Sequence, residues 1–133
     1  MPENFKDLRI LAVDDNKLNL IVLSQFLKLL GLTADLANGG AEALEKIKIS
    51  SYELIFMDVH MPEIDGFTAT KEIRLSNKQI IIFGLSADNS KQTITKSFDA
   101  GMNDYLTKPI NKEKLIDLVQ FYFGNNGIKY ELI

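Results

Sequence analysis

The fold of this protein is indicated by the apolar run Leu54–Met57, which reads LIFM and ends directly in Asp58. Apolar residues also occupy nearly every position of Leu8–Val13 and Ile80–Leu85. Runs of this kind are typical of strands that are buried on both faces, as in a parallel sheet covered by helices. Two shorter and weaker strand candidates are Thr33–Ala37 and Asp104–Thr107.

Segments with helical periodicity separate these strands. Gly31 and Gly101 follow the first and fourth of these segments, where glycine favours the end of a helix, and Ser90 and Asn111 are candidate caps at the start of the fourth and fifth. The alternation of strands and helices predicts one doubly wound α/β domain with a five-stranded parallel sheet and five helices. The expected helices are Lys17–Leu30, Gly40–Ile49, Gly66–Leu75, Ser90–Ala100 and Lys112–Phe123.

The composition fits a single globular domain. Of the 133 residues, 46% are hydrophobic and 25% are charged, which excludes a wholly disordered chain. The net charge of -3 provides no overall electrostatic attraction to nucleic acid or to anionic lipid. Cysteine is absent, which excludes disulfides, thiol catalysis and cysteine-based zinc sites.

We expect no targeting or membrane-spanning segment in these residues. Its N-terminus lacks the basic and then apolar pattern of a signal peptide, and polar residues interrupt the most apolar stretch, Leu18–Leu32. We therefore expect a cytoplasmic domain at residues 8–123, with an N-terminal extension at 1–7 and a C-terminal tail at 124–133.

Polar side chains gather where the expected strands end. Asp14 and Asp15 follow the first strand, Asp58 the third and Ser86 the fourth, and the fifth is followed by Lys108. These ends share one edge of the sheet, where doubly wound folds place their functional crevice. Three neighbouring carboxylates repel one another unless a cation offsets them, and Mg²⁺ prefers such oxygen ligands. A carboxylate can attack phosphorus, so the edge is predicted to be a phosphoryl-accepting aspartate site.

Four motifs occur at this edge in order: ILAVDDN at 10–16, LIFMDVHMPEIDG at 54–66, GLSA at 84–87 and GMNDYLTKP at 101–109. With them, the sequence resembles the receiver domains of two-component response regulators, the CheY-like family, over residues 8–123. The local spelling is most similar to receivers of hybrid sensor histidine kinases. The resemblance implies the flavodoxin-like strand order 2-1-3-4-5. It also implies that the chain is either the receiver of a hybrid kinase or a stand-alone regulator.

The resemblance implies roles for the acids and the lysine. Asp58 matches the residue that accepts a phosphoryl group. Asp15 and Asp58 match the side chains that ligate Mg²⁺, or alternatively Mn²⁺, and the backbone carbonyl of His60 matches a third ligand. Asp14 matches the acid that holds a metal-bound water, and Lys108 matches the lysine that pairs with the phosphoryl group or with the acceptor.

The resemblance also implies a switch. Ser86 matches the hydroxyl that moves toward the phosphoryl group, and Tyr105 matches the aromatic residue that then moves inward. Together they would reshape the surface formed by the fourth helix, the fifth strand and the fifth helix. Ala87 is small, as a phosphodonor's approach requires, and Pro109 matches the usual cis proline of the family.

The first expected helix carries apolar residues over more than one face. At about 100° per residue, Leu18, Ile21 and Leu29 lie beside the arc that we assign to the core. In the family this helix is where the helical bundle of a phosphotransfer partner docks, so we hypothesise that Leu18 and Ile21 form part of a docking patch. The alternative is that they cover the sheet edge or pack on the last helix. The residues assigned to the core arc are Val22, Leu23, Phe26, Leu27 and Leu30.

The expected partners are a sensor histidine kinase, a histidine phosphotransfer domain or both, and a downstream protein target. Neither direct nucleic-acid binding nor membrane binding is expected of this segment. A receiver promotes its own phosphorylation and dephosphorylation but is not a conventional enzyme.

Three other functions share parts of the pattern. A phosphatase of the haloacid dehalogenase type also uses an aspartate nucleophile, but it requires a second acid where this chain has His60. A flavodoxin-like FMN carrier binds phosphate at its first loop, where Asp14 and Asp15 would repel it. A pseudo-receiver would act as a binding module without phosphorylation, and the presence of every expected site residue counts against it.

Overall fold

The computed structural model describes residues 7–124 and contains five strands and five helices in alternation. Residues 1–6 and 125–133, which make up most of the expected extension and tail, lie outside the described residues. In chain order the elements are β1 (Ile10–Val13), α1 (Lys17–Leu29), β2 (Ala34–Ala37), α2 (Gly40–Ile49), β3 (Leu54–Asp58), α3 (Gly66–Ser76), β4 (Ile81–Ser86), α4 (Lys91–Ala100), β5 (Asp104–Thr107) and α5 (Lys112–Phe123).

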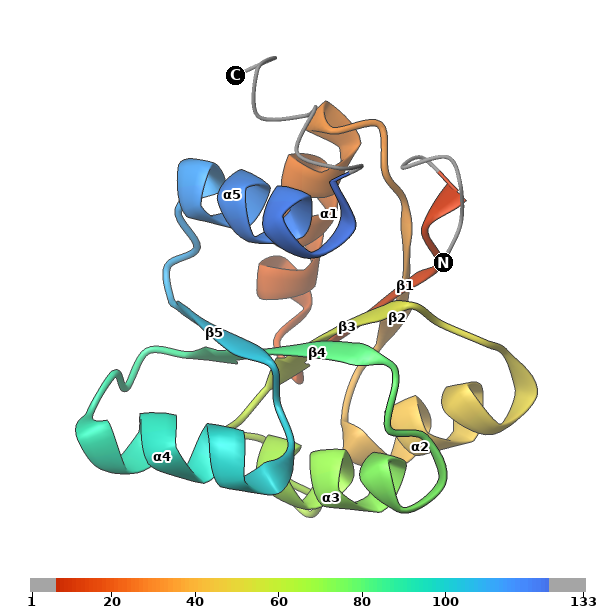
Figure 1. The fold of residues 1–133 in the computed structure, drawn as a ribbon, viewed down its shortest axis with the longest axis vertical. Coiled ribbons are helices and arrows are strands. Elements are labelled where there is room, and N and C mark those ends of the chain that lie inside the picture. Colours follow the sequence, from red (N-terminus) through yellow and green to blue (C-terminus); the bar gives the residue numbers. More distant parts are fainter. Residues whose placement is uncertain (1–6, 125–133) are drawn as a thin grey trace.

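The five strands form one parallel sheet in the order β2-β1-β3-β4-β5. Helices α1 and α5 cover one face of the sheet, and α2, α3 and α4 cover the other (Figure 1). The predicted doubly wound architecture and strand order are therefore confirmed.

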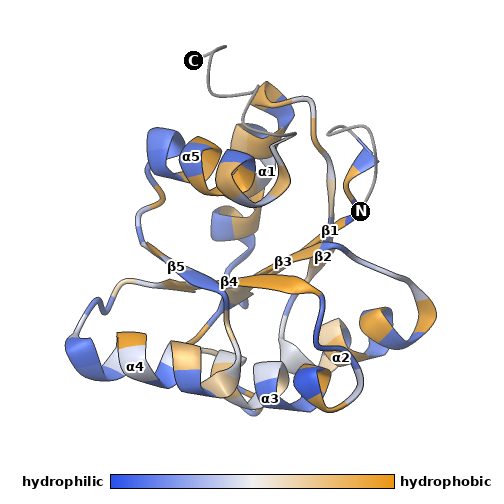
Figure 2. Ribbon diagram, in the orientation of Figure 1, coloured by the Kyte–Doolittle hydropathy of each residue, from blue (hydrophilic) through white to orange (hydrophobic). Residues whose placement is uncertain are grey.

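Two hydrophobic clusters, one on each face, hold the three layers together. On one face, Leu23 and Leu27 of α1 and Leu115 of α5 pack with Phe56 and Phe83 of the central strands. On the other face, α2 and α3 pack against the opposite side chains of β1, β3 and β4. Strands β3 and β4 carry no polar side chain before their last residues, Asp58 and Ser86, which fits strands that are covered on both faces (Figure 2).

The helix ends are formed by the residues that the sequence suggests. Ser90 accepts a hydrogen bond from Thr93 N at 3.2 Å, and Asn111 accepts one from Lys114 N at 3.0 Å. Gly101 ends α4 in the left-handed conformation with φ of 113°. These local devices set where each helix begins or ends relative to the sheet.

Several element boundaries differ from expectation by one or two residues. Strand β1 begins at Ile10 rather than at Leu8, α1 ends at Leu29, and β3 includes Asp58. Fraying and capping at element ends are decided by backbone hydrogen bonds that the apolar pattern does not report. The inclusion of Asp58 in β3 matters for the site because the strand then fixes the backbone of this residue.

The assignment of Val22 to the core was wrong. Its exposed fraction is 39%, whereas Leu20, which lies outside the predicted core arc, is 2% exposed. The buried stripe of α1 is Leu20, Leu23 and Leu27, with spacings of three and four residues. Leucine and valine line α1 on both sides of this stripe, so the sequence alone could not locate its edge.

No helix within residues 7–124 has both the length and the apolar character needed to cross a membrane.

Gly66 begins α3 at a point of very close approach to the strand that carries Asp58. A Cβ atom at this position would collide with the carbonyl oxygen of Asp58 and would lie 2.7 Å from the Cα of Val59. Both atoms belong to the backbone and cannot rotate away. A Cβ at Gly84, in contrast, would meet Met102 Sδ at 2.5 Å, near the end of a flexible side chain.

We predict that Gly66→Ala lowers the free energy of unfolding by about 3 kcal/mol, because a backbone segment must move to admit the methyl group. Gly84→Ala should cost about 1 kcal/mol, since Met102 can adopt another rotamer. Gly39→Ala is the control, because nothing lies within 4 Å of its Cβ position. Urea denaturation measures all three, and equal losses for Gly66→Ala and Gly84→Ala would contradict the prediction.

Candidate functional site

The site lies at the carboxyl edge of the sheet, where the register of the strands places the expected site residues next to one another. Val13 pairs with Met57, so the next residues, Asp14 and Asp58, lie side by side. Ser86 ends β4 and pairs with Thr107, which is followed by Lys108. Four strands thus deliver side chains to one place, as the sequence predicts.

The three carboxylates converge closely enough to share a cation. One oxygen from each of Asp14, Asp15 and Asp58 lies within 4.8 Å of the others. Asp14 and Asp58 are buried, at 2% and 3% exposed, whereas Asp15 is exposed. The donor set consists of hard carboxylate oxygens, which suit Mg²⁺ or Mn²⁺.

Lys108 supplies the positive charge between the two buried acids. Its Nζ lies 2.9 Å from Asp14 Oδ2 and 3.2 Å from Asp58 Oδ1. Burial on its own lowers the pKa of Lys108, but the hydrogen bond to Asp14 and the charges of both acids raise it above the usual value. The ammonium group therefore stays charged. The peptide bond between Lys108 and Pro109 is cis, as the resemblance implies.

Asp58 is held in an environment that opposes its negative charge. Burial and, next, the neighbouring charge of Asp14 raise its pKa to about 7, although the ion pair with Lys108 acts in the opposite direction. The backbone N–H of His60 donates to Asp58 Oδ1 at 3.3 Å. An additional positive charge at this place would favour the ionised carboxylate.

Asp14 is tied to the beginning of α1. Asn16 N donates to Asp14 Oδ1 at 2.9 Å, and Asn19 Nδ2 donates to Asp14 Oδ2 at 3.2 Å. The motif at 10–16 ends at Asn16, so it does not predict the contact of Asn19 with Asp14. Helical spacing was the available signal, because a residue in the first turn of α1 lies above the strand end from which the helix departs.

Ser86 and Tyr105 are both linked to Asp88 in the loop after β4. The backbone N–H of Asp88 donates to Ser86 Oγ at 2.9 Å, and the Tyr105 hydroxyl donates to the backbone carbonyl of Asp88. Ser86 is 1% exposed. Hydrogen bonds from Thr93 and Ser90 lower the pKa of Asp88 and hold its side chain at the start of α4.

The remaining expected residues lie on the surface around this edge. His60 is exposed in the loop after β3. On α1, Leu18 is 67% exposed and Ile21 is 49% exposed. Both side chains therefore present apolar surface to solvent.

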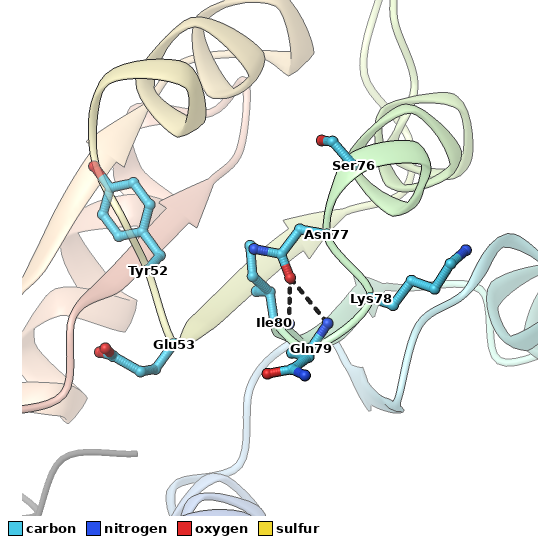
Figure 3. A pocket seen from close by; sticks show the side chains of 7 residues that line it. All are labelled: Tyr52, Glu53, Ser76, Asn77, Lys78, Gln79 and Ile80. Atoms are coloured by element: carbon cyan, nitrogen blue, oxygen red, sulfur yellow. Dashed lines mark hydrogen bonds between the residues drawn. The ribbon is translucent and has the colours of Figure 1, made fainter.

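A cleft of about 620 Å³ lies at the opposite, amino edge of the sheet (Figure 3). There Asn77 Oδ1 accepts hydrogen bonds from the backbone N–H groups of Gln79 and Ile80 at 2.9 and 3.1 Å. None of the expected site residues lines this cleft. The lining residues are Tyr52, Glu53, Ser76, Asn77, Lys78, Gln79 and Ile80.

A doubly wound parallel sheet with this acidic edge, a lysine and a buried hydroxyl defines the CheY-like class. The chain matches the response regulator receiver domain family over residues 10–120 and belongs to that family. It is therefore a receiver domain of the kind found in hybrid histidine kinases and response regulators of phosphorelay signalling. The comparisons lend no support to the phosphatase, FMN-carrier or pseudo-receiver alternatives.

One curated relative is hybrid signal transduction histidine kinase L of Dictyostelium discoideum, 38% identical over 127 residues. The match covers 90% of this chain but only 7% of the length of that kinase.

Two solved structures bear on the site. The receiver domain of a sensor histidine kinase from Pseudomonas aeruginosa, with a magnesium ion coordinated in its active-site cleft, is 33% identical with a TM-score of 0.81 and covers 89% of this chain and 98% of its own. The receiver domain of Saccharomyces cerevisiae Ssk1, in a co-crystal structure with the histidine phosphotransfer protein Ypd1, is 34% identical with a TM-score of 0.80. The match covers 89% of this chain and 90% of the Ssk1 receiver chain.

We predict that Asp58→Asn changes how the stability of the metal-free protein depends on pH. Between about pH 4 and pH 7, folded Asp58 keeps a proton that an unfolded aspartate has already released, so stability falls as pH rises through this window. Asparagine does not titrate. Asp58→Asn should therefore match the wild type at pH 5 and exceed it by about 2 kcal/mol at pH 8.

Urea denaturation in the presence of EDTA measures this difference. The comparison of the two proteins at each pH cancels the titration of all other groups that the substitution leaves unperturbed. A difference that stays constant from pH 5 to pH 8 would show that the pKa of Asp58 is not raised.

Proposed function

We propose that Asp58 accepts a phosphoryl group from a phosphohistidine of a sensor histidine kinase or a histidine phosphotransfer domain, in a reaction that requires Mg²⁺. The observation that carries this proposal is the convergence of Asp14, Asp15 and Asp58 around the ammonium group of Lys108. Phosphoryl transfer to a carboxylate needs a buried nucleophile, two further acids and a positively charged side chain, here the ammonium group of Lys108.

The residues present fit a divalent cation. Asp15 and Asp58 would be its side-chain ligands, the carbonyl of His60 would be a third ligand, and Asp14 would hold a metal-bound water. When bound, Mg²⁺ neutralises the carboxylates and the oxygens of the transferred group. The magnesium ion in the related Pseudomonas receiver supports this assignment, and Mn²⁺ has the same ligand preference.

The transfer itself is a displacement at phosphorus. An oxygen of ionised Asp58 forms a bond to phosphorus as the bond between phosphorus and the donor imidazole nitrogen breaks. The imidazole departs with the bonding electron pair and takes its proton from solvent. Strand β3 fixes the backbone of Asp58, and the N–H of His60 restrains the carboxylate, so the nucleophile meets the donor in one orientation.

Lys108 and Ser86 stabilise the transferred group. Lys108 Nζ already contacts Asp58 at 3.2 Å, so a small rotation brings it to a phosphoryl oxygen. Ser86 Oγ is buried at the end of the neighbouring strand and can donate its O–H to a second oxygen. Both contacts become stronger as negative charge accumulates next to Asp58.

Asp88 provides the connection from the phosphoryl group to the surface. If Ser86 turns toward the phosphoryl group, its hydrogen bond with Asp88 N is lost and the loop is released. Tyr105 is bonded to the carbonyl of the same residue, so it loses its outward anchor and can move inward. This sequence of contacts reshapes the α4–β5–α5 surface and exposes it to a downstream protein target.

The donor docks on the exposed apolar patch of α1, formed by Leu18 and Ile21, next to the acidic edge. Their apolar surface is exposed to solvent, whereas the buried stripe of the same helix faces the sheet. An exposed apolar patch beside a reactive group is characteristic of a protein-binding site. The complex of the related Ssk1 receiver with Ypd1 supports a phosphotransfer protein as the partner.

The proposed receiver domain spans residues 8–123 and belongs either to a hybrid histidine kinase or to a stand-alone regulator. The 38% identity with a Dictyostelium hybrid kinase favours the first. A cytoplasmic location is supported by the absence of cysteine.

We predict that incubation with acetyl phosphate and Mg²⁺ adds one phosphoryl group to the protein, detected by intact-mass spectrometry. The adduct should be labile to hydroxylamine, as an acyl phosphate is, and should be absent without Mg²⁺. Asp58→Asn is the matched control, since it keeps the shape of the side chain but removes the nucleophile.

Beryllofluoride, a mimic of the phosphoryl group, provides a second measurement for receivers that accept phosphate only from a protein donor. Failure of the wild type both to form the adduct and to bind beryllofluoride with Mg²⁺ would contradict the proposed function and favour the pseudo-receiver.

We predict that Leu18→Asp slows phosphotransfer from phosphorylated yeast Ypd1 at least tenfold, because a charge would be buried against the partner's apolar surface. Leu29→Asp is the control. Leu29 has the same exposed fraction of 67% on the same helix but lies three turns further from the acidic edge. Acetyl phosphate is too small to contact the patch, so it reports whether the site is intact in each variant. Equal rates for the two variants would refute this docking surface.

A further inference from the structure

Asn19 lies outside the set of residues to which the proposed function gives a role, yet its side chain contacts the site. Its amide Nδ2 donates to Asp14 Oδ2 at 3.2 Å. The same oxygen accepts a hydrogen bond from Lys108 Nζ at 2.9 Å. Asp14 is 2% exposed, so water cannot freely replace either donor.

The position of Asn19 is fixed by a closed chain of hydrogen bonds at the start of α1. Asn16 N donates to Asp14 Oδ1 at 2.9 Å. The side chain of Asn16 caps the helix and accepts the backbone N–H of Asn19 at 3.1 Å. The side chain of Asn19 then returns to Asp14, so each of the three residues orients the next.

The geometry points to Asn19 as the positioning residue that holds Asp14 when Lys108 leaves it. This inference rests on the proposed function, in which Lys108 pairs with a phosphoryl group on Asp58. One ammonium group cannot serve Asp14 and the phosphoryl oxygens equally well, because the latter carry more charge. As Lys108 moves, Asp14 Oδ2 keeps the amide of Asn19 as its donor, and the carboxylate stays in place for the cation.

The chemistry of asparagine suits this task better than that of its close relatives. An aspartate would accept rather than donate and would add a fourth carboxylate to the cluster. A leucine has a similar volume but no donor, and a serine is too short to span from α1 to Asp14. The amide donates without adding charge, so it stabilises Asp14 in any charge state of the neighbouring groups.

A double-mutant cycle on Mg²⁺ binding separates positioning from general stability. In the wild-type background, Asn19→Leu should raise the Kd for Mg²⁺ about threefold, because Lys108 still holds Asp14. In the Lys108→Met background the same substitution should raise the Kd at least tenfold, since Asp14 then retains only the backbone N–H of Asn16. Calorimetric titration of the purified protein with Mg²⁺ alone gives all four constants.

The control is Gln25→Leu, an exposed position on the same helix, which introduces the same residue without touching Asp14. Its Kd for Mg²⁺ should equal that of the wild type. Melting temperatures in EDTA report folding separately. If Asn19→Leu does not fold, Asn19→Ser takes its place in the cycle, because it removes the same donor without adding apolar bulk.

An equal effect of Asn19→Leu in the two backgrounds, or no effect in either, would overturn the inference while leaving the proposed function intact, provided that the wild type binds Mg²⁺. Absence of Mg²⁺ binding by the wild type would overturn both. Binding of beryllofluoride provides an independent measurement. Asn19→Leu should weaken the binding of beryllofluoride by a larger factor than the binding of Mg²⁺ alone, because only the phosphoryl mimic draws Lys108 away from Asp14.

Discussion

The ion pairs of Lys108 with Asp14 and Asp58 are the interaction on which the site depends. Two carboxylates that are almost fully buried and side by side would be costly in the folded protein without a compensating charge. Lys108 offsets part of this cost, and the raised pKa of Asp58, about 7, shows that the compensation is incomplete. The remaining electrostatic imbalance favours a bound cation and makes the site sensitive to one.

The fold supplies this arrangement through strand ends rather than through a flexible loop. Parallel strands β1, β3, β4 and β5 all finish at the same edge, and the register sets Asp14 level with Asp58. The rigid sheet holds the acids together despite their repulsion, because the hydrophobic clusters on both faces resist any separation of the strands. The loops that follow the strands are left free to carry the residues that respond, notably Asp88.

Much of the architecture could be predicted from the sequence because its signals are local. Continuous apolar runs identified the buried strands, and Ser90, Asn111 and Gly101 marked helix ends. The acids, the hydroxyl and the lysine could be placed at one edge from topology alone. Val22 was placed wrongly because an apolar stripe has no visible boundary on a helix that is apolar over several faces. Asn19 received no contact because a hydrogen bond between a helix and a strand end depends on the side-chain direction.

Pattern and motif are enough to indicate the class of the protein and the residues at the acidic edge, and the resemblance to the receiver family adds the strand order. The pairing of these residues, in contrast, depends on the tertiary structure. Lys108 lies closer to Asp14 than to Asp58, and Ser86 and Tyr105 are both linked to Asp88. The contacts of Lys108 with Asp14 and of Tyr105 with Asp88 join residues that are far apart in the chain, and only the packing of the tertiary structure brings such residues together.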